Sequence, residues 1–245
     1  MQERPNYFDE RVAANYDQSS APMFAPEVLD PTVDFLAALA GDGRALELGI
    51  GSGRVALPLA ARGVPVHGIE LSRAMAQRLR EKPGAEGIEV TIGDFATAKF
   101  EGAFRLAYLV FNTISNLTTQ DDQVACFRNA ASHLEPGGVF VIELFVPALR
   151  QLPLGERGVV FRLDEDRWGI DEYDVANQGL VSHHFLEVDG ALEHRSAPFR
   201  YIWPAELDLM AQLAGLRLRE RWANWNREPF TSESRSHISV YEKPA

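Results

Sequence analysis

Between Arg44 and Val146 short apolar runs alternate with amphipathic stretches, and this alternation constrains the fold more than any other feature of the chain. The apolar runs have the length of buried strands, whereas the stretches between them have helical spacing. Strands that alternate with helices predict a mostly parallel, doubly wound sheet with helices on both faces. We therefore predict an α/β fold. The expected strands are residues 45–48, 64–69, 88–92, 106–111 and 139–146.

Helix signals fill the gaps between these strands. One helix is expected over residues 55–61, and Ser72 is the expected N-cap of another. Either Thr118 or Thr119 caps the helix that precedes the last parallel strand. Each expected helix therefore connects two neighbouring strands of the sheet.

The segment 1–30 precedes this region and is predicted to form a cap over it. Apolar residues recur at every fourth position from Phe8 to Tyr16, which predicts one short amphipathic helix there. Asp30 and Pro31 have the chemistry of an N-cap and a first helical residue, so a second helix is expected to begin at this point.

After Pro147 the pattern changes, and residues 157–203 contain four strand-like segments without a helix signal. Hairpin-type turns between these segments predict an antiparallel insert that acts as a lid. A helix from Pro204 and two last strands, 216–225 and 236–242, would complete the sheet at one edge. We treat residues 1–245 as a single domain.

Composition excludes several classes of protein. The 245 residues are 46% apolar, which is enough for a sizeable core, and the net charge of −11 argues against nucleic acid as a partner. Cys126 is the one cysteine, so no disulfide and no cysteine-rich metal cluster is expected, and no metal site is predicted. The chain has no apolar run of membrane-spanning length and no signal-peptide pattern at its start, so we expect no membrane partner and a cytoplasmic protein.

A glycine-rich turn at the end of the first expected strand is the most informative motif. Glycines let a backbone approach a ligand, and the start of the following helix offers free N–H groups. The dinucleotide pattern would need glycine at position 54 or 56, where the chain has Arg54 and Ala56. An acid stands two residues ahead of the first glycine, where it would repel a phosphate but attract an ammonium group. The residues of this turn are Glu47, Gly49, Gly51 and Gly53.

Two further acids end the next two strands. Glu70 ends the second strand, where a carboxylate can accept hydrogen bonds from both ribose hydroxyls. Asp94 ends the third strand and could accept a hydrogen bond from an adenine amino group, while Phe95 packs on the ring. Three carboxylates and a tight turn are therefore expected to meet at one edge of the sheet.

This ordered set resembles the motifs of class I S-adenosylmethionine-dependent methyltransferases over roughly residues 30–146, including the turn at Leu134–Gly138. The resemblance implies a Rossmann-like, seven-stranded sheet of order 3-2-1-4-5-7-6 with strand 7 antiparallel. It implies S-adenosyl-L-methionine as cofactor and a small-molecule acceptor, as in the similar bacterial amino-sugar N-methyltransferases. A looser likeness links residues 211–240 to a bacterial peptide N-terminal methyltransferase. The resemblance to the class I methyltransferases implies these cofactor-binding residues: Tyr16, Glu47, Gly49, Gly51, Gly53, Glu70, Leu71, Ser72, Met75, Gly93, Asp94, Phe95 and Phe111.

Two alternatives stay open at this point. A glycine turn of this kind also occurs in NAD(P)-dependent oxidoreductases, which would bind a nicotinamide cofactor. A non-catalytic module could bind the adenosyl cofactor without turnover. Our preferred hypothesis is an enzyme that transfers a methyl group by in-line displacement to nitrogen or oxygen of a small metabolite, as a monomer or homodimer.

Methyl transfer needs alignment and exclusion of water more than it needs a diagnostic catalytic pair. Asn112 follows the fourth strand and either positions the acceptor or serves as a turn residue. Glu143 lies within the fifth strand and either faces the acceptor or, as we favour, pairs with an arginine. Tyr16 and His237 complete the catalytic candidates, since His237 with Arg235 could reach the mouth of the pocket.

The insert adds aromatic and histidine side chains. Because neighbouring strand residues point to opposite faces, His183 and His184 are not expected to share one site with His194. Alternation puts Phe199, Tyr201 and Trp203 on one face, which is either core or the roof of an acceptor pocket.

Overall fold

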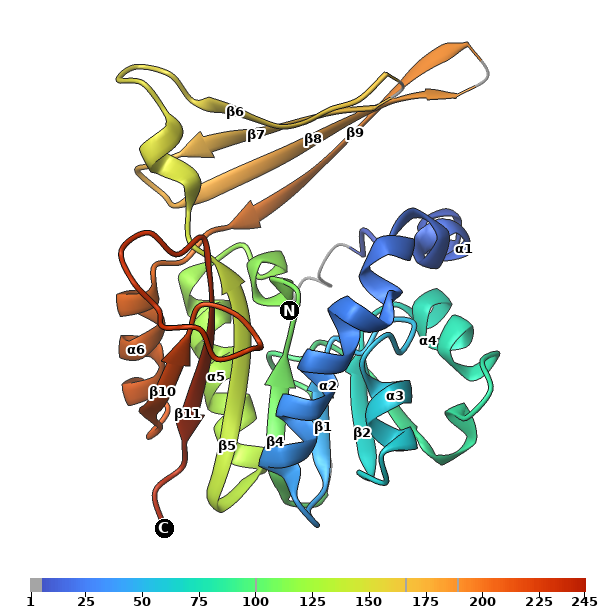
Figure 1. Cartoon of the computed structure of the whole chain (residues 1–245), viewed down its shortest axis with the longest axis vertical. Helices are drawn as coiled ribbons and strands as arrows, with labels where there is room; N and C mark the ends of the chain where they lie inside the picture. The colour runs from blue at the N-terminus through green and yellow to red at the C-terminus, as the bar shows by residue number, and fades with distance from the viewer. Residues whose placement is uncertain (1–5, 100, 166, 189) are drawn as a thin grey trace.

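The computed structural model describes residues 6–99, 101–165, 167–188 and 190–245, and its centre is a seven-stranded sheet of order β10-β11-β5-β4-β1-β2-β3 (Figure 1). The strands β1 to β5 are mutually parallel, and β11 runs antiparallel to both β5 and β10. In strand numbers of the methyltransferase type this is 3-2-1-4-5-7-6, so the predicted sheet order is confirmed. The bounds are β1 Ala45–Leu48, β2 Val66–Glu70, β3 Glu89–Ile92, β4 Phe104–Leu109, β5 Leu134–Phe145, β10 Arg217–Trp222 and β11 Ser236–Glu242.

Helices cover both faces of this sheet and explain why its central strands carry apolar residues at almost every position (Figure 1). Every residue of β1 and β2 is buried. One hydrophobic cluster lies against α2 and α3, and the other lies against α5 and α6. The bounds are α1 Glu10–Ser19, α2 Pro26–Ala40, α3 Ala56–Ala61, α4 Arg73–Arg80, α5 Gln120–His133 and α6 Pro204–Leu213.

The helix expected to begin at Asp30 begins earlier. In the structure α2 starts at Pro26, and Pro31 lies inside the helix. Pro26 satisfies the same first-turn preference as Pro31, because neither residue has an N–H to donate. The extra turn also buries Leu29 against the core, which offsets the cost of an internal proline.

The first helix is shorter than expected at its start. Asp9 caps α1 by accepting a hydrogen bond from Val12 N at 2.9 Å, so Phe8 lies outside the helix. The Phe8 ring still packs edge-on against Tyr16, with ring centroids 6.1 Å apart. The chain direction therefore changes at Phe8, just before the helix.

The insert forms a separate antiparallel sheet of order β6-β7-β8-β9 that overhangs the carboxyl ends of the parallel strands (Figure 1). At its base Tyr173, Leu180 and Tyr201 form a small apolar cluster against Phe145. At its far end Glu193 forms an ion pair of 2.7 Å with Arg11 of α1. The strands are β6 Gly158–Leu163, β7 Arg167–Asp174, β8 Gly179–Val188 and β9 Ala191–Arg200.

Candidate functional site

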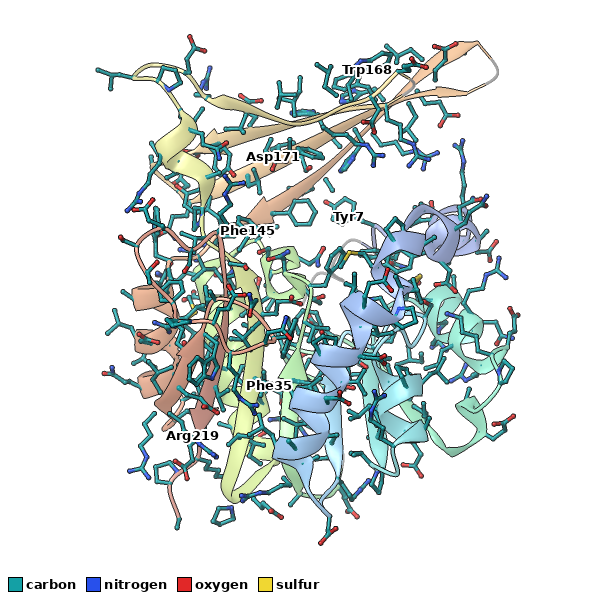
Figure 2. The ribbon with its side chains drawn as sticks, in the orientation of Figure 1. Tyr7, Phe35, Phe145, Trp168, Asp171 and Arg219 are labelled. Atoms are coloured by element: carbon teal, nitrogen blue, oxygen red, sulfur yellow. The ribbon has the colours of Figure 1, made fainter. Side chains whose placement is uncertain are left out.

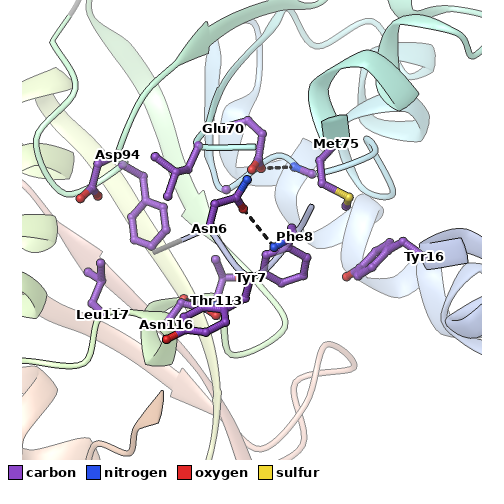
Figure 3. Close-up of a pocket in the computed structure, with 14 residues that line it drawn as sticks. Asn6, Tyr7, Phe8, Tyr16, Glu70, Met75, Asp94, Thr113, Asn116 and Leu117 are labelled. Carbon is purple, nitrogen blue, oxygen red and sulfur yellow. Dashed lines mark hydrogen bonds between the residues drawn. The ribbon is translucent and has the colours of Figure 1, made fainter. Parts of the chain in front are cut away.

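A cavity opens at the carboxyl ends of β1, β2 and β4, under the N-terminal segment. Figure 3 shows Asp94 and Leu117 at one end of the cavity and Tyr16 at the other. The lining residues are Asn6, Tyr7, Phe8, Tyr16, Gly49, Gly51, Glu70, Leu71, Met75, Asp94, Phe95, Thr113, Asn116 and Leu117.

The glycines of the turn after β1 have different tasks. All three have positive φ, between 56° and 82°. A Cβ on Gly51 would have a single neighbour within 4 Å, the Met75 methyl at 3.4 Å, so this backbone faces open cavity. A Cβ on Gly53 would lie 2.3 Å from a Leu79 methyl group, and Gly53 does not line the cavity. Gly53 is therefore required for packing of the turn against α4, and its expected contact with the cofactor stays a prediction.

Glu70 ties the glycine turn to the start of α4. Its two carboxylate oxygens accept hydrogen bonds from Gly51 N at 2.8 Å and from Ser72 N at 2.7 Å. Burial raises the pKa of Glu70, whereas the backbone amides lower it. Each oxygen keeps a lone pair for a further donor, and the carboxyl group lines the cavity.

Glu47 lies beside a second, smaller cavity of about 350 Å³ that shares Tyr16, Gly49 and Gly51 with the first. The Tyr108 hydroxyl donates a hydrogen bond to Glu47 at 2.9 Å. Burial raises the pKa of Glu47 to about 8. The Ala56 backbone and the nearby Arg54 guanidinium lower the pKa of Glu47, and a further cation in the cavity would also stabilise the charged form.

Asp94 and Phe95 lie at the end of the larger cavity farthest from Tyr16. Asp94 Oδ1 accepts a hydrogen bond from Ala96 N at 2.9 Å, which holds the turn after β3. Phe95 is buried and belongs to the core cluster on the α5 side. Gly93, which precedes them, does not line either cavity, because its N–H is bound to the Glu70 carbonyl as part of the sheet.

The N-terminal segment covers the cavity and is hydrogen-bonded to residues of the expected cofactor-binding motifs. Ser72 Oγ donates to the Phe8 carbonyl and also caps α4 through Met75 N, so Ser72 is fully buried and does not line the cavity. Asp17 accepts a hydrogen bond from Ser52 and pairs with Lys82. Burial raises the pKa of the Tyr16 hydroxyl, which points into the cavity in Figure 3.

A strained turn after β4 presents Phe111 at the smaller cavity. Phe111 and Asn112 both have positive φ, at 56° and 59°, which is rare for a bulky residue. Glu143 accepts from Phe111 N at 2.7 Å and from Trp225 Nε1 at 2.9 Å. The favoured pairing of Glu143 with an arginine is therefore wrong, because neutral donors of two loops satisfy its carboxylate.

Asn112 serves as a turn residue, which is one of the two roles that the sequence predicted for it. Its Oδ1 accepts a hydrogen bond from Phe145 N at 2.7 Å, which locks the turn after β4 to the end of β5. Asn112 does not line either cavity. The side chain thus positions Phe111 rather than a ligand.

His237 does not reach the mouth of the pocket. Its ring is fully buried, and Nδ1 lies 2.9 Å from Ser239 Oγ. Burial lowers the pKa of His237 to about 3, so the imidazole is neutral. His237 shares its face of β11 with Tyr241, which packs in the hydrophobic cluster against α5 and α6, and it lines neither cavity.

Several cavity residues were not among the candidates. Asn6 and Phe8 come from the N-terminal segment, and Thr113 and Leu117 follow the strained turn. The signal that could have found Thr113 is its place just after a parallel strand, where open sheets bind ligands. Among the described residues no group of three His, Cys, Asp or Glu could hold a metal ion. Nor does the described part contain a helix of sufficient length and apolarity to cross a bilayer.

Known proteins with similar sequences and structures are methyltransferases. A family described as a methyltransferase domain matches residues 45–138. The cypemycin N-terminal methyltransferase of Streptomyces sp is 30% identical over 249 residues, which cover 98% of both chains. The CcbJ methyltransferase from Streptomyces caelestis has a TM-score of 0.80 and 39% identity, covering 88% of this chain and 89% of that one.

A more distant structure shows the same fold. The SAM-bound structure of CalS10, an amino pentose methyltransferase from Micromonospora echinaspora, has a TM-score of 0.69 at 21% identity, over 99% of this chain and all of that one. None of the proteins named here is a nicotinamide-dependent oxidoreductase or a binding module without activity.

The cavity has the features that an adenosyl sulfonium requires. Gly51 leaves room for a ligand against the backbone, and the carboxyl groups of Glu47, Glu70 and Asp94 lie along the two connected cavities. An acidic site without a phosphate-binding glycine pattern suits a cationic, phosphate-free cofactor. The chain belongs to the S-adenosylmethionine-dependent methyltransferases, and its cofactor is S-adenosylmethionine.

Proposed function

We propose that this enzyme methylates an amine nitrogen of a small natural product or peptide-like metabolite. The observation that carries the proposal is the pair of connected cavities, in which three carboxyl groups and the glycine turn meet under the N-terminal segment. The relative from Streptomyces sp is named as an N-terminal methyltransferase, which favours nitrogen as the acceptor atom.

The proposed cofactor contacts follow the two cavities. Glu70 and Leu71 would hold the ribose, and Asp94 would accept from the adenine amino group beside Phe95. Glu47 would attract the ammonium group from the smaller cavity, where Gly51 leaves the backbone open. Met75, Tyr16 and Phe111 would border the sulfonium end. Segment 1–30 would then act as a cap and residues 157–203 as a lid on one domain.

The lining favours an acceptor that needs no strong base. When bound, the cofactor supplies a methyl group that is already activated by the positive sulfur. Among the described residues that line the two cavities there is no histidine, lysine or cysteine. A neutral amine can attack without losing a proton first, whereas an alcohol would need a base at the reacting atom.

The protein's own contribution is alignment and exclusion of water. The Glu143 carboxylate and Asn112 Oδ1 fix the turn that carries Phe111, so that its ring borders the smaller cavity. Tyr16 lines both cavities, and its hydroxyl points into the larger one (Figure 3). Fixed groups of this kind lower the barrier by orienting the two reactants.

Calorimetry with S-adenosylmethionine or S-adenosylhomocysteine tests the site. Glu70→Gln and Asp94→Asn should each weaken binding by about 1–3 kcal/mol, because each removes a charged hydrogen-bond acceptor. Glu81→Gln, on the exposed end of α4, is the matched control and should bind normally. Unchanged affinity in both cavity variants would show that the cofactor lies elsewhere.

The acceptor atom is tested by mass spectrometry on paired amines and alcohols of the same skeleton. N-methylation of the amines alone is the expected result. Methylation of the alcohols with no methylation of the amines would contradict the proposal.

A further inference from the structure

The inner face of the insert carries a polar cluster that the cofactor site does not use. Asp171, Ser182 and His184 lie on β7 and β8, and the register places Asp171 opposite Ser182 and Gly169 opposite His184. Ser182 Oγ lies 3.3 Å from His184 Nε2. Since residues two apart share a face, these three side chains share the face of Tyr173 and Leu180.

That face is turned toward the cofactor cavity. Tyr173 and Leu180 pack on Phe145 at the end of β5, and β9 runs beside the turn Thr113–Asn116 that lines the cavity. At the other end Glu193 is bound to Arg11 of α1. Figure 2 places Asp171 on the insert, above Phe145 and Tyr7 in that view. The cluster thus lies on the roof between two contacts with the walls of the cavity.

The carboxylate of Asp171 is incompletely satisfied. Its Oδ1 is buried and has no hydrogen-bond partner among the described residues, which is rare and costly for a carboxylate. Ser182 hydrogen-bonds to Asp171, and the nearby imidazoles are His184 and His183. A buried acceptor of this kind is stabilised when a donor, above all a charged one, approaches it.

The cations near this cluster are already paired. Arg195 of the insert and Arg11 of α1 both bind Glu193, at 2.9 Å and 2.7 Å, and Arg162 pairs with Asp164. Burial lowers the pKa of His184, so its ring is uncharged at neutral pH and offers a hydrogen-bonding rather than a repelling surface. The net charge of −11 further favours cationic over anionic small molecules.

We propose that Asp171, presented by Ser182 and flanked by His184, binds a protonated amine of the methyl acceptor. The acceptor then carries a second basic nitrogen besides the atom that is methylated, and the insert selects for it. This inference rests on the proposed function as an amine methyltransferase and adds the recognition element that the cavities lack.

The test uses amine acceptors in pairs that differ only in a second basic nitrogen, with piperazine against morpholine as the simplest pair. In the wild-type enzyme the doubly basic member should have a KM at least about tenfold lower. Asp171→Asn should remove this preference through KM, with kcat changed much less. Glu172→Gln takes the same charge from the opposite face of β7 and is the matched control, which should keep the preference.

The affinity for S-adenosylhomocysteine, measured by calorimetry, reports whether Asp171→Asn is folded with an intact cofactor site. Should that variant not fold, Ser182→Ala provides the second measurement, with the same expected loss of preference. A preference that survives in the folded variants overturns the role of Asp171 and leaves the proposed function standing. A panel in which no amine is methylated overturns the proposed function itself.

Discussion

The edge of the parallel sheet and the insert above it hold their polar groups in different ways. At the sheet edge, Glu70 is bound by two backbone amides, and one of them lies only two residues away. On the insert, Glu193 is bound by two arginines: Arg195, two residues away, and Arg11, which is 182 residues away and 64% exposed. The first arrangement is rigid because the backbone provides the donors, and the second can open because long, solvated side chains provide them.

The glycines of the two regions also differ in how closely other atoms pack around them. Gly53 sits where a Cβ would collide with Leu79, whereas Gly190, in the turn between β8 and β9, has no atom within 4 Å of an added Cβ. Both have positive φ, of 82° and 76°. The cofactor turn is therefore constrained by packing and conformation, and the tip of the insert by conformation alone.

The largest expected effect tests this contrast directly. Gly53→Ala should lower the free energy of unfolding by about 2–4 kcal/mol, because it adds a left-handed alanine and overpacks Leu79. Gly190→Ala should cost only about 1 kcal/mol, since the conformational cost remains but no atom is displaced. Urea denaturation of both variants measures the difference. Equal losses would mean that packing does not distinguish the two turns.

A second prediction concerns the pH dependence of cofactor binding. Burial raises the pKa of Glu47 to about 8, so below that pH the carboxyl is mostly protonated and has no charge to attract the ammonium group. Affinity should therefore rise as pH increases from 6 to 8, by up to about tenfold per pH unit, and reach its plateau near pH 8, where the α-amino group of the cofactor begins to lose its own charge. Calorimetry across this range measures it.

Two variants make this test specific. Glu47→Gln cannot ionise and should give a weak and flat profile. Tyr108→Phe removes a hydrogen bond that lowers the pKa of Glu47, so the plateau should move up by roughly one pH unit. A wild-type affinity that does not change between pH 6 and 8 would remove Glu47 from the proposed site.

The smallest effect is expected at the contact between α1 and the insert. Arg11→Ala should leave the melting temperature within about 1 °C of the wild type, because exposed ion pairs contribute little to stability. Hydrogen exchange in α1 should nevertheless be faster, since the link to β9 is lost. Arg195→Ala keeps the Arg11–Glu193 pair and should not change exchange in α1. Equal exchange in the wild type and Arg11→Ala would show that this ion pair does not hold the two segments together.

Much of the fold could be predicted from residues close together in the sequence. Ser72 and Thr119 act as N-caps through hydrogen bonds that reach three residues along the chain, and Glu70 follows an apolar strand. The start of α2 could not be predicted, because Pro26 and Pro31 have the same local preference and only the burial of Leu29 separates them.

The candidate site, like the fold, could be predicted from the sequence only where nearby residues determine the structure. The order of motifs from Glu47 to Asp94 marked the cavity, since each lies at the carboxyl end of its strand. The roles of Glu143 and His237 were hidden, because Glu143 binds Trp225 and His237 lies near Arg221 and Asp208, groups that are distant along the chain. No spacing rule connects Glu143 to Trp225.

The amino-acid sequence by itself determined the parallel sheet and the glycine turn after β1, because periodicity, capping and turn geometry act over a few residues. The class of chemistry followed from the resemblance of its ordered motifs to those of methyltransferases. Only the tertiary structure decided which carboxylates stay open to a ligand. Glu143 is satisfied by a backbone amide and an indole, while Asp171 keeps a buried oxygen that has no donor within the described part of the chain. That distinction depends on which distant groups packing brings within hydrogen-bond reach.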